Sequence, residues 1–202
     1  MKSYSLLILF CFLQTLICDE AGVSQKSLQD ALTTSLPYIK SFHQKSFHLL
    51  GDETLRQVNL YTTPINSNNV QFIFDEKGIL HIKFINLKGE LKGYTYFQDK
   101  TKRDYIGFAP FTMKLNNISL EEKYSIESTK KNDGKYDVKF KSIDKDNSSV
   151  SYNIIKFTMT NYSEDSESLT RYKIRYLNFN PFKQYLQKIS ELILETLQNK
   201  LK

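Results

Sequence analysis

Cysteine and histidine are scarce in this chain, and their scarcity argues against several kinds of chemistry. The chain has two cysteines, Cys11 and Cys18, and three histidines, His43, His48 and His81. The histidines form no catalytic triad or metal-binding spacing, because His43 and His48 are five residues apart and do not share a helical face. The sequence also lacks a Gly-x-Ser-x-Gly motif and a glycine-rich phosphate loop. We therefore expect no enzymatic activity, no metal and no cofactor, and a hydrolase is the least favoured alternative.

The first eighteen residues have the pattern of a secretory signal peptide. Lys2 precedes an apolar run from Leu6 to Cys18, which is followed by the acidic pair Asp19 and Glu20. This run is too short to span a bilayer. We expect cleavage near Cys18–Asp19, which makes residues 1–18 the signal and 19–202 the mature protein, secreted or in the lumen of the secretory pathway. Cleavage a few residues away, or retention as an uncleaved anchor, is the alternative.

Such a cleavage removes both cysteines, so the mature protein must hold its core by packing alone in an oxidising compartment. The remaining length is enough for one domain with a sizeable core, and no second long apolar run predicts a membrane span. We find no internal repeat and no low-complexity linker. The sequence therefore predicts a single domain over residues 19–202.

The surface charge is mildly basic, with a formal net charge of +6 at pH 7. Because the charges are interspersed, an ordinary solvated surface is favoured over a nucleic-acid footprint. Three Asn-x-Ser sequons, at Asn117, Asn147 and Asn161, fit a secreted glycoprotein. Asparagine and serine are abundant here, so one or two of these sequons are also expected by chance.

Two amphipathic helices are predicted, one near each end of the mature chain. In residues 178–202, Asn180 is the expected N-cap and Pro181 the first helical residue. Apolar residues there recur at steps of three and four, which predicts a helix with one apolar face. Near the start, Ser24 is the expected N-cap of a helix that Pro37 should interrupt.

Between the helices, from about Asn69 to Leu177, apolar and polar residues alternate in the pattern of successive strands. The alternation slips at Ile85–Leu87, which is typical of a bulge in a strongly bent strand. Each strand has one apolar and one polar face, as in an antiparallel sheet that covers a core on one side. A long meander of this kind should curl, and two helices on its concave face would enclose a groove or tunnel.

These residues resemble the lipid-binding domains of bactericidal permeability-increasing protein, lipopolysaccharide-binding protein and their tubular lipid-binding relatives. The segments that carry the resemblance are Gly22–Leu28, Ile85–Lys92, Phe111–Leu120 and the closing helix from Pro181. The resemblance covers nearly the whole mature chain as one module. The chain differs from the two-module immune proteins in that it has a single module and lacks the disulfide that ties the sheet to the closing helix. These differences argue against endotoxin neutralisation more than against lipid binding.

The resemblance implies an α+β fold in which a long, highly twisted antiparallel sheet rolls around a lengthwise C-terminal helix, with an additional N-terminal helix. It also implies an apolar cavity for a phospholipid or another acyl-chain lipid. An apolar helical stripe without the resemblance would be read as ordinary core. The residues expected to contact lipid are Leu28, Leu32, Leu36, Ile39, Leu80, Ile82, Phe84, Tyr185, Ile189, Leu192, Ile193 and Leu197.

Two further predictions concern partners. Lys100, Lys102 and Arg103 at a predicted hairpin tip are candidates for transient contact with anionic head groups at a membrane surface. A solvated turn, nearly balanced by Asp99 and Asp104, is the favoured alternative. For the whole protein, the alternative to a lipid carrier is a secreted structural glycoprotein that forms homo-oligomers or filaments through its sheet edges, with or without bound lipid.

Overall fold

The computed structural model describes residues 21–45, 55–98, 106–145, 148–159, 162–165 and 180–201. Several predictions concern residues outside these ranges and are not tested by the structure. They are the signal peptide 1–18, the last part of the predicted strand region, which ends at Leu177, the basic residues Lys100, Lys102 and Arg103, and the sequons at Asn147 and Asn161.

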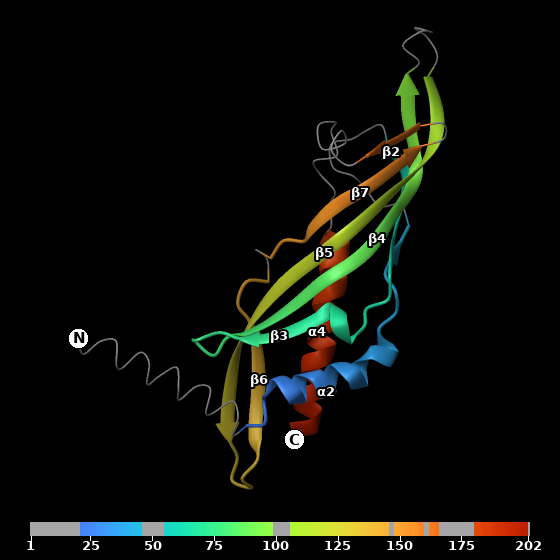
Figure 1. The fold of residues 1–202 in the computed structure, drawn as a ribbon. Coiled ribbons are helices and arrows are strands. Elements are labelled where there is room, and N and C mark those ends of the chain that lie inside the picture. Colours follow the sequence, from blue (N-terminus) through green and yellow to red (C-terminus); the bar gives the residue numbers. More distant parts are fainter. Residues whose placement is uncertain are drawn as a thin grey trace, which may run out of the picture.

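Within the described ranges, helices lie at both ends of the chain and strands lie between them (Figure 1). The elements in chain order are α2 (Gln25–Ser35), η1 (Leu36–Tyr38), β1 (His43–Gln44), β2 (Leu55–Thr62), η2 (Ser67–Asn69), β3 (Val70–Phe74), β4 (Leu80–Gln98), β5 (Ile106–Lys130), β6 (Tyr136–Ser142), β7 (Ser151–Met159), β8 (Tyr162–Asp165) and α4 (Asn180–Leu201).

The sheet is built on one long antiparallel hairpin, β4 and β5, of 19 and 25 residues. β4 pairs with β5 from Leu80↔Tyr124 to Gln98↔Ile106. Along its other edge β4 pairs with β3 and then with β2, and β5 likewise pairs with β6 at one end and β7 at the other. The two long strands therefore run the length of the molecule, and different short strands flank each end (Figure 1).

Two asparagines bend the long hairpin where the sequence predicted a bulge. Asn86 in β4 and Asn117 in β5 have φ values of 54° and 49°, in the left-handed region that asparagine tolerates better than most residues. The β4–β5 register shifts between Phe84 and Leu87, which returns Leu87 to the buried face. The predicted slip is thereby confirmed. Asn117 is exposed, and its glycosylation stays a prediction.

The first helix, α2, begins at the predicted cap and is interrupted at Pro37 as predicted, but Ile39, expected on its apolar face, lies in extended backbone beyond it. Ser24 caps the N-terminus of the helix through two reciprocal hydrogen bonds. The Ser24 hydroxyl accepts a hydrogen bond from the Ser27 backbone N–H, and the Ser27 hydroxyl accepts one from the Ser24 backbone N–H. The helix ends at Ser35, and Pro37 lies in the short 3-10 turn η1 that follows. The face that α2 buries consists of Leu28, Ala31, Leu32 and Ser35.

The second helix, α4, begins at Asn180, one residue before the predicted start, and lies lengthwise along the sheet (Figure 1). Polar contacts hold it to α2: the Ser35 and Thr196 hydroxyls lie 3.0 Å apart, and Lys200 Nζ donates to Thr34 Oγ1 at 2.9 Å. Its buried face also contacts β5 and β6. The predicted α+β fold, a long twisted antiparallel sheet rolled around a lengthwise C-terminal helix with an additional N-terminal helix, is confirmed.

Candidate functional site

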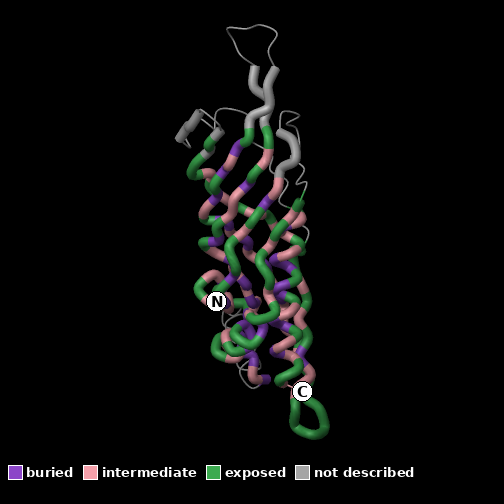
Figure 2. Tube along the Cα trace, turned by 90° about the vertical axis from the view of Figure 1, so that its right-hand side faces the viewer, coloured by how far each residue is buried: buried purple, intermediate pink, exposed green. Residues whose placement is uncertain are grey.

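The candidate site is the interior between the sheet and the two helices. Figure 2 shows buried positions repeating along the strands and helices that surround it. On β4, Leu80, Ile82 and Phe84 face inward and are fully buried. Because side chains alternate between the faces of a strand, His81 and Lys83 belong to the opposite face. The interior is therefore a continuous apolar core, closed on one side by α4.

Most of the side chains predicted to contact lipid belong to this core. Three of them, Leu36, Ile39 and Tyr185, are only partly buried and pack against the core from outside. Leu192 is half-buried and lies outside it. Whether any of these residues contacts lipid stays a prediction. The fully or nearly fully buried members of the set are Leu28, Leu32, Leu80, Ile82, Phe84, Ile189, Ile193 and Leu197.

An aromatic cluster closes the interior at the N-terminal end of α4. The Phe42 ring lies 5.2 Å from that of Phe182 in an edge arrangement and 5.1 Å from that of Tyr185. The Tyr185 hydroxyl donates to the backbone carbonyl of Lys40. Burial raises the pKa of Tyr185, so the hydroxyl stays a donor at neutral pH. This cluster fastens the first turns of α4 to the segment that follows α2.

A polar cluster lies within the otherwise apolar interior, and the sequence analysis did not predict it. Glu122 of β5 is 4% exposed and Gln187 of α4 is 6% exposed. The Glu122 carboxylate accepts from the Tyr124 hydroxyl at 2.9 Å, from Gln187 Nε2 at 3.1 Å and from the Ser148 hydroxyl at 3.4 Å. Gln187 Nε2 also donates to the Lys145 carbonyl at 3.1 Å. The cluster therefore links the sheet to α4 by hydrogen bonds.

Ser190 extends this polar cluster on α4, one turn beyond Gln187. Its side chain is fully buried, and within the part of the chain that the structure describes its Oγ makes no hydrogen bond of normal geometry. Burial raises the pKa of Tyr124 and the Glu122 carboxylate raises it further, whereas the nearby Ser190 hydroxyl lowers it. Tyr124 is thus a neutral donor. We call Glu122, Tyr124, Gln187 and Ser190 the interior polar cluster.

Strand alternation contains the signal that would have found Glu122. Leu120, Tyr124 and Ile126 are apolar residues at alternate positions of β5, and Glu122 occupies the inward position between the first two. The register confirms its orientation, since Glu122 pairs with Ile82. An acid at an inward position of an apolar row is the feature to search for.

A hollow on the molecular surface lies next to the interior polar cluster, between α4 and the loop after β6. It has a volume of about 480 Å³. Gln187, whose amide holds the Glu122 carboxylate, forms part of its wall. Lys145 and Glu191 on its rim are paired at 2.8 Å. The other lining residues are Asn180, Lys183, Gln184 and Lys188.

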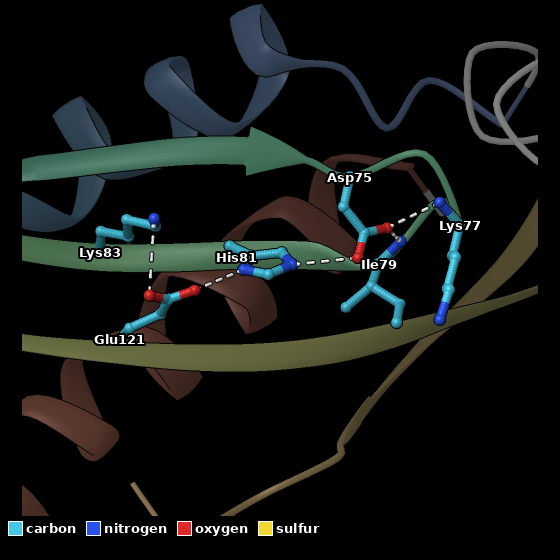
Figure 3. A network of polar contacts seen from close by, with 6 residues as sticks. All are labelled: Asp75, Lys77, Ile79, His81, Lys83 and Glu121. Atoms are coloured by element: carbon cyan, nitrogen blue, oxygen red, sulfur yellow. Dashed lines mark hydrogen bonds and ion pairs between the residues drawn. The ribbon is translucent and has the colours of Figure 1, made fainter. Parts of the chain in front are cut away.

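A second polar cluster lies on the outer face of the sheet, centred on His81 (Figure 3). His81 Nδ1 lies 2.5 Å from Glu121 Oε1, and His81 Nε2 lies 3.2 Å from Asp75 Oδ2. Lys83 Nζ lies 3.5 Å from the other oxygen of Glu121. The imidazole therefore bridges the β3–β4 turn and β5. Both of its nitrogens are engaged by carboxylates.

Both carboxylates of the His81 cluster have lowered pKa values. For Asp75, burial raises the pKa, but hydrogen bonds from the Ile79 backbone, His81 and the Lys77 backbone together outweigh it. For Glu121, the hydrogen bond with His81 is the largest cause of the lowered pKa, and Lys83 lowers it further. Each carboxylate therefore holds its proton less readily in the folded protein than in the unfolded chain.

This arrangement predicts a loss of stability in acid that depends on His81. A carboxyl group whose pKa is lower in the folded protein stabilises the fold at pH values above its ordinary pKa, which is 3.8 for Asp75 and 4.5 for Glu121. This stabilisation is lost as the pH falls through the lowered pKa of the folded protein. In His81→Ala we expect a smaller fall in melting temperature between about pH 6 and pH 3 than in the wild type. Melting curves at several pH values measure this. His43→Ala, at an exposed histidine stacked on Tyr61, is the control and should keep the wild-type slope. Equal slopes for all three proteins would contradict the prediction.

Two features are absent from the described residues: a metal-binding cluster of side chains and a membrane-spanning helix. No group of three or more histidine, cysteine, aspartate or glutamate side chains there is arranged to hold a metal ion. Among the helices of the same residues, none combines the length and apolar character needed to cross a membrane.

Comparison with solved structures shows distant similarity to proteins of known structure. No protein-family model and no curated protein matches the chain. Among solved structures, the chain is similar to the crystal structure of Takeout 1 from Epiphyas postvittana, with 18% sequence identity. The alignment covers 88% of this chain and 89% of that chain, with a TM-score of 0.34.

Proposed function

We propose that this protein is a secreted, non-enzymatic lipid-binding protein that holds an acyl chain between its curled sheet and α4, for sequestration or transfer. The observation that supports this most is the continuous apolar interior, which follows the long β4–β5 hairpin and is closed lengthwise by one amphipathic helix. The elongated, apolar character of that interior suits a chain of methylenes. The proposal also agrees with the resemblance to tubular lipid-binding domains and with the predicted signal peptide.

The energetics favour an acyl ligand without requiring many polar contacts. Burying one methylene contributes about 0.8 kcal/mol, so a long acyl chain gains on the order of 10 kcal/mol before the costs of binding. Those costs include separating side chains that now pack against each other. The side chains concerned include those of the buried face of α4, whose contacts with the sheet an entering acyl chain would replace.

The alternative, a structural glycoprotein that assembles through its sheet edges, has less support. The edge strands of the described sheet are short: β1 has two residues, β3 has five, β6 has seven and β8 has four. Short edge strands present few unpaired backbone groups to another chain, which is one way that proteins avoid edge pairing. The edges of this sheet therefore favour the carrier over the filament.

Native mass spectrometry of the glycoprotein purified from its source, followed by lipid extraction, tests the proposal. We expect stoichiometric lipid on a monomer or dimer. A lipid-free protein in a large, regular assembly would contradict the proposal and support the structural alternative.

A matched pair of variants tests where the lipid lies. Ile193→Thr introduces a hydroxyl into the fully buried face of α4, whereas Ile155→Thr makes the same change at an exposed position of β7. We expect the first to lower bound lipid several-fold and the second to leave it unchanged. Equal lipid in both folded variants would place the ligand outside the interior.

A further inference from the structure

We propose that the interior polar cluster binds the polar end of the ligand, and that it selects a ligand whose polar end provides an O–H or N–H donor. This inference rests on the proposed function, because it assigns the orientation of the acyl ligand within the interior. It concerns Glu122, Tyr124, Gln187 and Ser190, none of which was among the residues predicted to contact lipid.

The polar side chains of this cluster are buried, whereas most polar side chains lie at the surface. Glu122, Gln187 and Ser190 are 4%, 6% and 0% exposed. Polar groups taken from water into an apolar core are unfavourable unless each finds a partner. The cost is highest for a carboxylate, and no cationic side chain is hydrogen-bonded to Glu122 in the described residues. A polar cluster in this position calls for a reason beyond packing.

The balance of donors and acceptors identifies the missing group. Both hydrogens of Gln187 Nε2 are used, one by Glu122 and one by the Lys145 carbonyl, and the Tyr124 hydrogen is used by Glu122. The carboxylate has about four acceptor positions and receives two donors, from Tyr124 and Gln187. The Ser148 hydroxyl, at 3.4 Å, shares its one hydrogen between Glu122 and the Lys145 carbonyl at 3.3 Å. Among the described residues, the Ser190 hydroxyl makes no hydrogen bond of normal geometry, although it lies near Tyr124. The cluster therefore has acceptor capacity left and a hydroxyl that is not fully used, which suits a group that donates and also accepts.

The position of the cluster fits the polar end of an acyl chain. Glu122 pairs across the sheet with Ile82, and Tyr124 pairs with Leu80, so both lie beside the apolar row of β4. On the other side, Gln187 separates Glu122 from the surface hollow of about 480 Å³. A ligand with its tail along that row and its hydroxyl or amine at Glu122 and Ser190 would enter or leave past Gln187.

Competition for a fluorescent fatty-acyl probe bound to delipidated protein tests this selection. The competitors are hexadecanol, hexadecylamine and hexadecyl methyl ether, which share the tail and differ in the donor. For the wild type we expect the alcohol and the amine to compete at least about tenfold better than the ether, which is about 1.4 kcal/mol. A further preference for the amine that Glu122→Gln removes would identify an ion pair with the carboxylate.

Ser190→Ala provides the sharper test, because binding and stability should change in opposite directions. We expect this variant to bind the alcohol about tenfold more weakly and the ether with unchanged affinity. Its melting temperature should rise by about 2–4 °C, because the substitution removes a buried hydroxyl that lacks a hydrogen bond of normal geometry. Ser35→Ala is the matched control. Ser35 is equally buried but bonds the Ala31 carbonyl and the Thr196 hydroxyl, so that variant should lose stability and keep its affinities.

The possible results separate this inference from the proposed function. Equal competition by alcohol and ether in the wild type would overturn the inference and leave the lipid carrier intact. The same holds if the alcohol is preferred but neither Ser190→Ala nor Glu122→Gln affects that preference. A wild-type protein that binds no acyl probe would overturn the proposed function and this inference together.

Discussion

Replacing Ile82 with alanine should lower the free energy of unfolding by about 2–5 kcal/mol. Ile82 is fully buried at the centre of the inner row of β4, between Phe72 of β3 and Glu122 of β5. The substitution removes three carbons and leaves a cavity that neighbours on two paired strands cannot easily fill. Denaturant unfolding of the lipid-free protein measures the change.

Ile73→Ala is the matched control for this prediction. Ile73 lies on the neighbouring strand β3, pairs with His81 and is 39% exposed. The same loss of carbons there should cost about 1 kcal/mol or less. Similar losses in the two variants would mean that the inner face of the sheet is no better packed than the outer face, which would contradict the proposed interior.

Replacing Phe182 with alanine should cost about 3–5 kcal/mol of unfolding free energy. Phe182 is fully buried in the first turns of α4, and its ring packs against those of Phe42 and Tyr185. The loss removes apolar burial and two aromatic contacts together. Because this cluster fastens the N-terminal end of α4, amide hydrogen exchange should also show lower protection in that part of the helix.

Tyr38→Ala is the control for the aromatic cluster. Tyr38 precedes Phe42 by four residues but is 75% exposed, so its removal should change stability by about 0.5 kcal/mol or less. A small effect of Phe182→Ala, comparable with that of Tyr38→Ala, would show that the aromatic cluster does not hold α4 in place.

Local rules in the sequence predicted most of the fold. The Ser24 cap, the interruption at Pro37 and the start of α4 near Asn180 follow from backbone donors that each helix end must satisfy or lack. The bulge near Asn86 followed from a slip in alternation, since a one-residue shift would otherwise turn Leu87 to solvent. These features depend on residues close together in the sequence, so they can be predicted from the sequence alone.

The parts that were not predicted depend on contacts between distant segments. The sequence did not show that β3 and β2 share one edge of β4, because alternation defines the faces of a strand but not its partners. For the same reason Glu122 looked like one more surface acid until Gln187 was placed opposite it, 65 residues away along the chain. Leu192 fits the apolar stripe by spacing but is only half-buried, because α4 presents its neighbour Ile193 to the core.

The contacts between α2 and α4 also have a consequence for the order of folding. They join residues 161 to 170 positions apart, such as Ser35 with Thr196 and Lys200 with Asp30, whereas β4 and β5 are adjacent in the chain. Closing the longer loop costs more chain entropy, so we expect the hairpin to form early and the helix pair to dock late. On the reverse path the helices would separate first, while the sheet stays intact. That partly open state exposes the inner row of β4, and it would give a lipid its opportunity to exchange.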